Sequence, residues 1–293
     1  MKLHSILEPV AGGLELVRRG THDRIEGLIA RQNLPRDLVE TAGASVGHLF
    51  AAEGKLLRPA LVLLSARAAT GDDAERFSPA LVGLAVAAEL LHSASLVHDD
   101  IIDEAESRRD RESVNGRFGN TMAVLAGDIL YAEFFVALSA LPGASWEHRG
   151  ELFRLFADTT QRMCFGEMRE HQISVRGTGE RLPEYLDIAE RKTAELMSVC
   201  CAGGAILCGA PTCTVRLLAD FGRSFGMAFL LVDDVLDGDT RLASTAEGME
   251  RALGYAGEAR GRATLFAPGV GKVALEALCA YLLDRAHAGV DRL

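Results

Sequence analysis

Two short clusters of aspartates are the residues of this chain whose types and spacing could do chemistry. The first cluster consists of Asp99, Asp100 and Asp103, and the second, with the same spacing, of Asp233, Asp234 and Asp237. On a helix, the first and third members of such a cluster lie one turn apart on the same face. Carboxylates so close together repel one another, and a bound cation keeps them ionised. Magnesium takes hard oxygen ligands and bridges carboxylates to phosphates, so two clusters facing across one cavity predict a diphosphate site held by metal.

A single cluster of this kind would be weak evidence, because aspartates at helix ends usually face solvent. Here each cluster directly follows an apolar run, SLV before Asp99 and FLLV before Asp233, which must be buried. Two copies at matching places on buried helices favour the metal site over two solvated helix ends.

Basic residues near these clusters could bind phosphate. Lys55 and Arg58 stand at a predicted helix start, where backbone N–H groups also attract anions. Arg108 and Arg109 follow the first cluster, and an arginine fork matches phosphate oxygens. Each has an ordinary alternative, a helix-start cation or a surface charge run. The same holds for His92 and Lys192: a helical histidine is more often a core residue, and a mid-helix lysine usually faces solvent.

Composition narrows the class of protein. The 293 residues carry a net charge of -10, and 48% of them are hydrophobic. An acidic chain argues against a nucleic-acid partner, although bound magnesium would still admit an anionic substrate. We interpret the clustered cysteines 200, 201, 208 and 213 as small buried hydrophobes of a reduced compartment. The N-terminus is too polar for a signal peptide and no uncharged stretch is long enough to span a bilayer, so we expect a cytoplasmic protein without a transmembrane segment.

The pattern of apolar residues predicts an all-α protein, and no break in composition suggests a second domain, so we expect a single domain over residues 1–293. Ser78 and Pro79 make a strong cap for the long buried helix that carries the first cluster, and Ser5 with Glu8 has the spacing of a capping box. Residues 105–116 are expected to form a charged loop, and residues 175–180 a polar loop. The predicted helices are 5–18, 23–31, 37–52, 59–70, 79–103, 118–141, 145–172, 183–208, 212–237, 244–266 and 270–288.

In these motifs the chain resembles the trans-polyprenyl diphosphate synthases, head-to-tail prenyltransferases with the all-α isoprenoid synthase fold. The resemblance implies an antiparallel helical bundle around a central cavity. The matching segments, in family order, are GKLLRP (54–59), ELLHSASLVHDDIIDEAESRR (89–109), FGNTMAVLAGDILYAEFF (118–135), GEMRE (166–170), KTAEL (192–196), GGAILCGA (203–210) and FGMAFLLVDDVLD (225–237). The first two segments and the last are the most specific.

The resemblance implies a role for each candidate residue. Isopentenyl diphosphate would be held by Lys55, Arg58, His92 and Arg109. Three magnesium ions, ligated by Asp99, Asp103 and Asp233, would bridge the allylic diphosphate, with Asp100, Asp234 and Asp237 in support. Arg108, Lys192 and Thr193 would contact the allylic diphosphate. These cations would neutralise the departing diphosphate, and apolar walls would protect the carbocation from water.

Ala94 and Ser95, one turn before the first cluster, would form the floor beneath the growing chain. Because both are small, we expect a medium or long all-trans product, beyond the farnesyl stage. A deeper plug from Met122, Phe134 or Phe135 could still limit its length.

The chain departs from the family pattern at three places. Leu230 replaces the usual glutamine before the second cluster, and Asp110 adds a negative charge beside the phosphate arginines. After Asp237, a lysine-containing segment of the family is missing, and Arg241 is the nearby cation that could substitute.

These departures keep other functions open. The chain could be a non-catalytic or weakly active subunit that tunes a partner synthase, although a dead subunit has no physical need for six repelling aspartates. A terpene cyclase fits less well, because cyclases carry a different second metal motif. Members of this family are commonly homodimers, so the resemblance implies a homodimer, with the apolar helix 118–141 as the candidate dimer contact. The alternative assembly is a heteromer.

Overall fold

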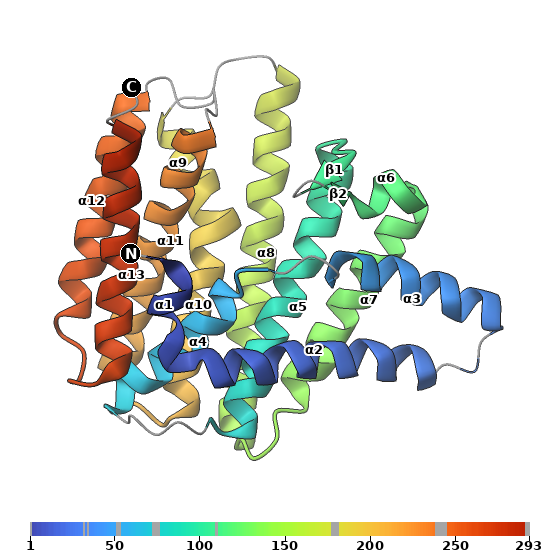
Figure 1. Cartoon of the computed structure of the whole chain (residues 1–293), viewed down its shortest axis with the longest axis horizontal. Helices are drawn as coiled ribbons and strands as arrows, with labels where there is room; N and C mark the ends of the chain where they lie inside the picture. Colours follow the sequence, from blue (N-terminus) through green and yellow to red (C-terminus); the bar gives the residue numbers. More distant parts are fainter. Residues whose placement is uncertain are drawn as a thin grey trace. The chain divides into compact units, whose positions relative to one another are not determined.

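The computed structural model describes residues 2–31, 33, 35–50, 54–71, 77–108, 111–176, 182–237 and 245–290. As predicted, the protein is all-α: the described residues contain one strand pair, of two residues each (Figure 1). The chain divides into two compact units. The larger comprises Met1–Ala11, Ala60–Phe77 and Ala144–Leu293, and the smaller Gly12–Pro59 and Ser78–Gly143.

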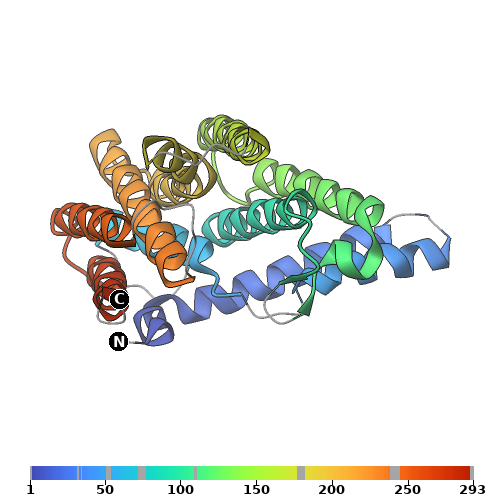
Figure 2. The ribbon, with the colours of Figure 1, turned by 90° about the horizontal axis from the view of Figure 1, so that it is seen from above.

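In the smaller unit, the long helix α5 (Pro79–Ile102) carries the first aspartate cluster at its end. The Ser78 side chain accepts a hydrogen bond from the Leu81 backbone N–H, and Pro79 occupies the first turn, which confirms the predicted cap. Because α5 is apolar nearly all round, it is buried, and it packs along α7 (Asn120–Ser139) (Figures 1 and 2).

By length and composition, α5 and α7 could each cross a membrane, but core helices of soluble proteins pass the same test. The most apolar window of α5 is 67% buried inside the protein, and that of α7 is 44% buried. Burial against other helices therefore accounts for most of the apolar character of α5, and the absence of a transmembrane segment stays a prediction.

The start of the chain differs from the sequence prediction. In place of two helices, 5–18 and 23–31, the structure has α1 (Leu3–Ile6), a 3₁₀ turn (Glu8–Val10) and the continuous helix α2 (Ala11–Arg31). The predicted capping box at Ser5 is wrong, because Ser5 lies inside α1. Gly20 does not break α2: a side chain there would lie 3.1 Å from Val86 of α5, so the glycine allows these helices to approach closely.

The segment after α5 is more ordered than the loop predicted for residues 105–116. It contains β1 (Ser107–Arg108) paired antiparallel with β2 (Arg111–Glu112), and then α6 (Val114–Phe118). Ser113 explains the start of α6, since its hydroxyl accepts from the Gly116 N–H and donates to the Ala105 carbonyl. The smaller unit also contains α3 (Arg36–Phe50), which packs on α6 and α7.

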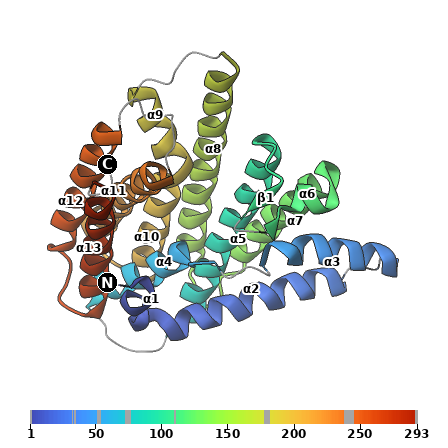
Figure 3. The same cartoon turned by 45° about the horizontal axis from the view of Figure 1, so that its top comes forward.

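The larger unit is a helical bundle. Helix α4 (Leu57–Thr70) contributes its residues from Ala60 onward, and the unit continues with α8 (Trp146–Arg176), α9 (Leu182–Ala189), α10 (Glu195–Leu207), α11 (Thr212–Asp237), α12 (Thr245–Ala263) and α13 (Val270–Val290). Helix α11 packs against α10 on one side and α12 on another (Figure 3). Its boundaries are those predicted, so the second aspartate cluster ends this helix.

Two findings in the larger unit depart from the sequence prediction. Helix α8 continues to Arg176, so residues 175 and 176, which were predicted to begin a loop, are helical, and residues 177–181 lie outside the described part. The single helix predicted for 183–208 is interrupted by a π-helical turn, Glu190–Ala194, which contains Lys192 and Thr193.

Candidate functional site

In the smaller unit, the three aspartates of the first cluster have different surroundings. Asp100 is buried, with 1% of its surface exposed; its Oδ1 accepts a hydrogen bond from Nε of Arg108 at 2.7 Å and forms an ion pair with Nη2 at 2.6 Å. Asp103 is the exposed C-cap residue of α5, and Asp99 is half-buried one turn earlier. Asp100 therefore anchors the β1–β2 hairpin. The assignment of Asp99 and Asp103 as metal ligands stays a prediction.

A cavity of about 440 Å³ lies in the smaller unit next to this cluster. Its lining includes His92, Asp100 and Arg108. Arg58 donates from Nη1 to Nε2 of His92 at 2.9 Å. Because a guanidinium can only donate, this contact places the imidazole proton of a neutral His92 on Nδ1.

The structure thus places two of the predicted phosphate-binding residues, His92 and Arg108, in the lining of one cavity, and a third, Arg58, in contact with His92. Lys55 lies in the adjoining segment before α4, and Arg109 falls outside the described residues. One cavity residue was missed by sequence reasoning. His48 of α3 donates from Nε2 to the Glu112 carbonyl at 2.7 Å and so holds the hairpin to α3; no motif pointed to it, because the two residues are distant in the chain.

The predicted chain-length residues lie on α5 and α7. Ala94 is fully buried, and the Ser95 hydroxyl donates to the His92 carbonyl at 2.9 Å, a bond within α5. Phe134 is also fully buried, and its ring lies tilted by 52° against that of the half-buried Phe135, with the ring centroids 4.8 Å apart. Their role in setting the product length stays a prediction.

In the larger unit, the second cluster ends α11, and two of its carboxylates have partners from other helices. Arg285 of α13 donates from Nη1 to Asp233 at 2.5 Å. The Tyr185 hydroxyl of α9, 2% exposed, donates to Asp234. Asp237 is exposed. Sequence reasoning missed Arg285 and Tyr185, because neither belongs to a recognisable motif.

Lys192 projects from the π-helical turn toward α8 and pairs with Glu167, at 2.6 Å, and with Glu170. These glutamates belong to the GEMRE segment, so the structure gives that motif a contact. Gly166 allows the approach, because a side chain at this position would lie 2.8 Å from Cβ of Arg191 and 3.0 Å from Cγ of Lys192. In this arrangement the lysine ammonium is held by acidic groups rather than left on a solvated face.

Leu230, where the related family has glutamine, packs half-buried against an apolar cluster of α11 and neighbouring helices that includes Leu231 and Met227. The substitution therefore replaces a polar contact with apolar packing. The other two departures, Asp110 and Arg241, lie outside the described residues.

The donor chemistry of the two clusters fits magnesium, since each supplies two carboxylates one helical turn apart. Within the described ranges, however, no group of three or more histidine, cysteine or acidic side chains is gathered closely enough to hold a metal ion. Asp100 and Asp234 are engaged by Arg108 and Tyr185, which agrees with supporting roles for them. That the clusters face each other stays a prediction, because they belong to different compact units.

Comparison with known proteins gives one consistent family. The polyprenyl synthetase family model matches residues 39–249, more than half of the chain. A short chain isoprenyl diphosphate synthase of Methanothermobacter thermautotrophicus is 34% identical over 228 residues, which cover 76% of this chain and 65% of the relative. Heptaprenyl diphosphate synthase component 2 of Geobacillus stearothermophilus is 38% identical over 195 residues, covering 67% and 58%. The chain thus spans about three fifths of the length of these relatives.

Among solved structures, geranylgeranyl pyrophosphate synthetase from Pyrococcus horikoshii superposes with a TM-score of 0.85 over 97% of this chain and 99% of that one. At 22% identity, this likeness establishes the fold alone. The predicted fold class, the all-α isoprenoid synthase fold, is confirmed.

Proposed function

Because the chain belongs to the polyprenyl synthetase family, we propose that it is a magnesium-dependent trans-prenyltransferase, which condenses isopentenyl diphosphate with an allylic diphosphate. The observation that carries the proposal is the pair of aspartate clusters, each of which ends a long helix and pairs with an arginine from another segment, Arg108 for the first and Arg285 for the second. Two matched relatives are named as isoprenyl and heptaprenyl diphosphate synthases. The diphosphates in these names are products of one type of reaction.

In this proposal the residues of the smaller unit hold isopentenyl diphosphate and part of the metal site. Lys55, Arg58, His92 and Arg109 bind the isopentenyl diphosphate. The hydrogen bond from Arg58 to His92 supports this assignment, because it fixes the imidazole with Nδ1–H as its remaining donor. Asp99 and Asp103 are metal ligands, and Asp100 orients Arg108.

The larger unit supplies the remaining ligand and the other allylic contacts. Asp233 is the metal ligand, Asp234 and Asp237 support it, and Lys192 and Thr193 contact the allylic diphosphate. Before the substrate binds, Arg285 balances the negative charge of Asp233. Glu167 and Glu170 balance the positive charge of Lys192. Binding must exchange these internal partners for metal and phosphate.

The reaction follows from these contacts. Magnesium ions, which Asp99, Asp103 and Asp233 would hold, would supply Lewis-acid neutralisation of the leaving diphosphate. Arg108 and Lys192 stabilise the same negative charge, so the allylic C–O bond breaks and its electron pair leaves with diphosphate. The double bond of isopentenyl diphosphate then forms the new C–C bond to the carbocation, and a proton is lost to the released diphosphate. Apolar residues of the helices keep water from the carbocation.

We expect elongation beyond the farnesyl stage, because Ala94 and Ser95 are small. The test is an incubation of the purified protein with Mg²⁺, labelled isopentenyl diphosphate and dimethylallyl, geranyl or farnesyl diphosphate, with chromatography of the products. A product longer than farnesyl diphosphate supports the proposal, and no product longer than farnesyl would overturn the chain-length assignment.

A second function is favoured by one comparison, since a matched relative is named as component 2 of a heptaprenyl synthase. The chain would then be a subunit of a heteromeric synthase. In the same assay, condensation only after addition of a partner subunit would support this alternative, and a hydrocarbon product would indicate a cyclase.

We propose a cytoplasmic homodimer as the working assembly, with α7 as the contact. Although α7 is strongly apolar, Val124, Leu125 and Val136 on it are 43%, 49% and 50% exposed. A second copy would cover these side chains. Val136→Glu is expected to shift the protein from dimer to monomer in sedimentation velocity, whereas Val273→Glu, at an exposed position of α13, should not; a dimer that persists in Val136→Glu would argue against this contact.

A further inference from the structure

The π-helical turn Glu190–Ala194 is a rare type of helical turn, and it carries two proposed substrate contacts. The Glu195 backbone N–H donates to the Glu190 carbonyl, five residues earlier, in place of the α-helical partner four residues earlier. The turn contains Lys192 and Thr193, the proposed contacts of the allylic diphosphate. Single π-helical turns are rare and recur at functional sites, so the contacts that maintain this one bear on the chemistry.

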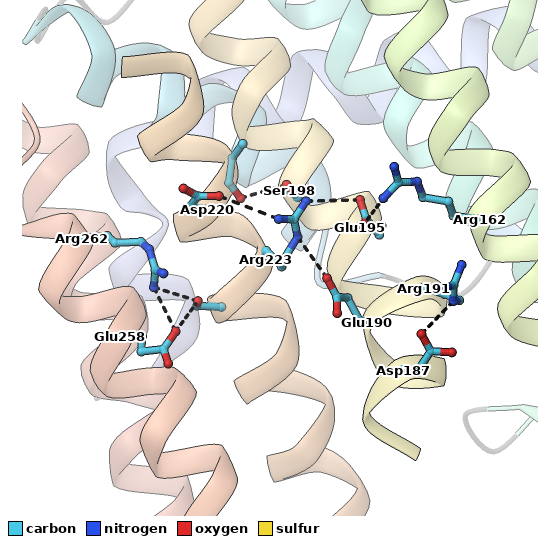
Figure 4. A network of polar contacts seen from close by, with 12 residues as sticks. Arg162, Asp187, Glu190, Arg191, Glu195, Ser198, Asp220, Arg223, Glu258 and Arg262 are labelled. Atoms are coloured by element: carbon cyan, nitrogen blue, oxygen red, sulfur yellow. Dashed lines mark hydrogen bonds and ion pairs between the residues drawn. The ribbon is translucent and has the colours of Figure 1, made fainter. Parts of the chain in front are cut away.

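Arg223 of α11 contacts both ends of the turn (Figure 4). Its Nε lies 3.4 Å from Oε1 of Glu190, and its Nη2 lies 3.6 Å from Oε2 of Glu195. From the other side, Arg162 of α8 donates to Oε1 of Glu195 at 2.8 Å. The Glu195 side chain is only 10% exposed, so solvent screens its interactions little.

The spacing of the two glutamates makes this bridge selective for the π-helical turn. Residues five apart in an α-helix point in directions that differ by about 140°, since each residue turns the chain by about 100°. In a π-helix, residues five apart are joined by the backbone hydrogen bond and lie above one another. One guanidinium can therefore reach both Glu190 and Glu195 only in the π-helical register.

A change of register would move the proposed substrate contacts. A π-helical turn closes its backbone hydrogen bond one residue later than an α-helical turn. If the turn became α-helical, the helix on one side of it would shift its register by one residue, and its side chains would rotate by about 100° around the helix axis. Lys192 could not then keep its present direction toward Glu167 and Glu170 on α8. Gly226 of α11 also fits this register, because a side chain there would lie 2.7 Å from Cα of Ala194.

We propose that Arg223 is a positioning residue: by bridging Glu190 and Glu195, it holds the π-helical turn in the register that presents Lys192 and Thr193 to the allylic diphosphate. This inference rests on the proposed function for its substrate. Because Arg223 and the second aspartate cluster share α11, the bridge also ties the turn to the helix that carries Asp233.

The test compares Arg223→Met and Arg223→Lys with a control, Arg262→Met. Arg262 of α12 makes a polar contact to α11, where it donates to Ser224 at 2.9 Å, and it pairs with Glu258 of its own helix at 3.1 Å, but it does not touch the turn (Figure 4). Two quantities are measured: hydrogen exchange of the backbone amides of residues 190–195, and the KM for each substrate separately.

In Arg223→Met, we expect amide exchange in the turn to rise about tenfold without a rise elsewhere, and the KM for the allylic primer to rise about tenfold with that for isopentenyl diphosphate unchanged. Arg223→Lys keeps the positive charge but not the guanidinium fork, so its amide exchange rate and primer KM should lie between those of the wild type and those of Arg223→Met. Arg262→Met should match the wild type. An unchanged primer KM, an equal rise for both substrates, or equal exchange in the control would overturn the proposal.

If Arg223→Met fails to fold, the primer KM of Arg223→Lys decides in the same way. A wild-type protein that condenses no substrates would instead refute the proposed function. The exchange measurement needs no activity, so it would still show whether Arg223 maintains the turn.

Discussion

At the scale of single residues, the structure separates aspartates that the sequence treats alike. Asp100 is buried against Arg108, whereas Asp103, three residues later, is an exposed cap. A buried carboxylate paired with a guanidinium stabilises the fold, because removal of either partner leaves an unpaired charge. An exposed carboxylate costs little to replace and is available to ligands.

The two positions therefore predict opposite outcomes. Asp100→Asn should lower the free energy of unfolding by about 2–3 kcal/mol, since it leaves the Arg108 guanidinium without its charged partner. Asp103→Asn should change stability by less than about 0.5 kcal/mol but abolish condensation. Urea denaturation and the condensation assay measure both. Equal loss of stability in the two variants would contradict the assignment of separate roles.

Arg285 gives a second prediction at this scale. It occupies Asp233, the proposed metal ligand, so Mg²⁺ and the guanidinium compete for one carboxylate. Arg285→Met should therefore bind Mg²⁺ alone about fivefold more tightly, since a partly exposed ion pair is worth at most about 1 kcal/mol. Titration calorimetry without substrate measures this, with Arg285→Lys as the charge-preserving control. An unchanged or weaker affinity in Arg285→Met would show that the ion pair does not compete with the metal.

At the scale of the helices, glycines decide which elements can approach closely enough to form the site. Gly166 brings α8 against the π-helical turn, and Gly222 brings α11 against α10, where a side chain would lie 2.6 Å from the Met197 carbonyl. The contact at Gly166 fixes the position of Lys192 relative to α8, and the contact at Gly222 fixes the position of α11, which carries the second cluster, relative to α10. The apolar pattern predicts helices but not which of their glycines lie in such contacts.

Helix α8 contains its own matched control. Gly166→Ala should destabilise the protein by about 1–3 kcal/mol, because its methyl group would overlap Arg191. Gly150→Ala, in the same helix with no atom within 4 Å of the new methyl group, should stabilise it by about 0.5–1 kcal/mol through helix propensity. Thermal or urea unfolding compares the two. A Gly166→Ala protein as stable as the wild type would show that α8 and the turn can separate without cost.

At the scale of the whole molecule, the cysteines differ in how deeply the fold buries their thiols. The prediction that the clustered cysteines are small buried hydrophobes is confirmed for Cys200 and Cys201. Cys208 is only half-buried, and the prediction is wrong for Cys213, which is exposed near the start of α11. Burial raises the pKa of the Cys201 thiol from 9.0 to about 12, and that of Cys279 likewise to about 12. Both thiols therefore stay protonated at pH values where an exposed cysteine ionises.

Alkylation tests this difference, because the thiolate is the reactive form. At pH 8, iodoacetamide should modify the exposed Cys213, whereas the buried Cys201 and Cys279 should react only after denaturation. The same raised pKa values mean that the folded state keeps protons which the unfolded chain releases above about pH 9, so stability should fall as the pH rises from 9 toward 12. Mass spectrometry of peptides identifies the modified residues, and early labelling of Cys201 at pH 8 would contradict its burial.

Much of the fold could be predicted from the sequence, because its signals are local. The cap at Ser78 and Pro79 set the start of α5, and the helix 212–237 was predicted with its observed boundaries. Helix periodicity, caps and the spacing of aspartates all act within a few residues, so the chain itself specified an all-α protein with an acidic cluster at the end of each of two buried helices.

Only the tertiary structure decided which partner each functional side chain takes. Asp233 pairs with a residue 52 positions away, Asp234 with one 49 positions away, and Glu195 with one 33 positions away. The π-helical turn has the same origin, because Arg223 and Gly226 reach it from another helix. Contacts between distant segments depend on how helices pack, and the local pattern of residues carries no record of that packing.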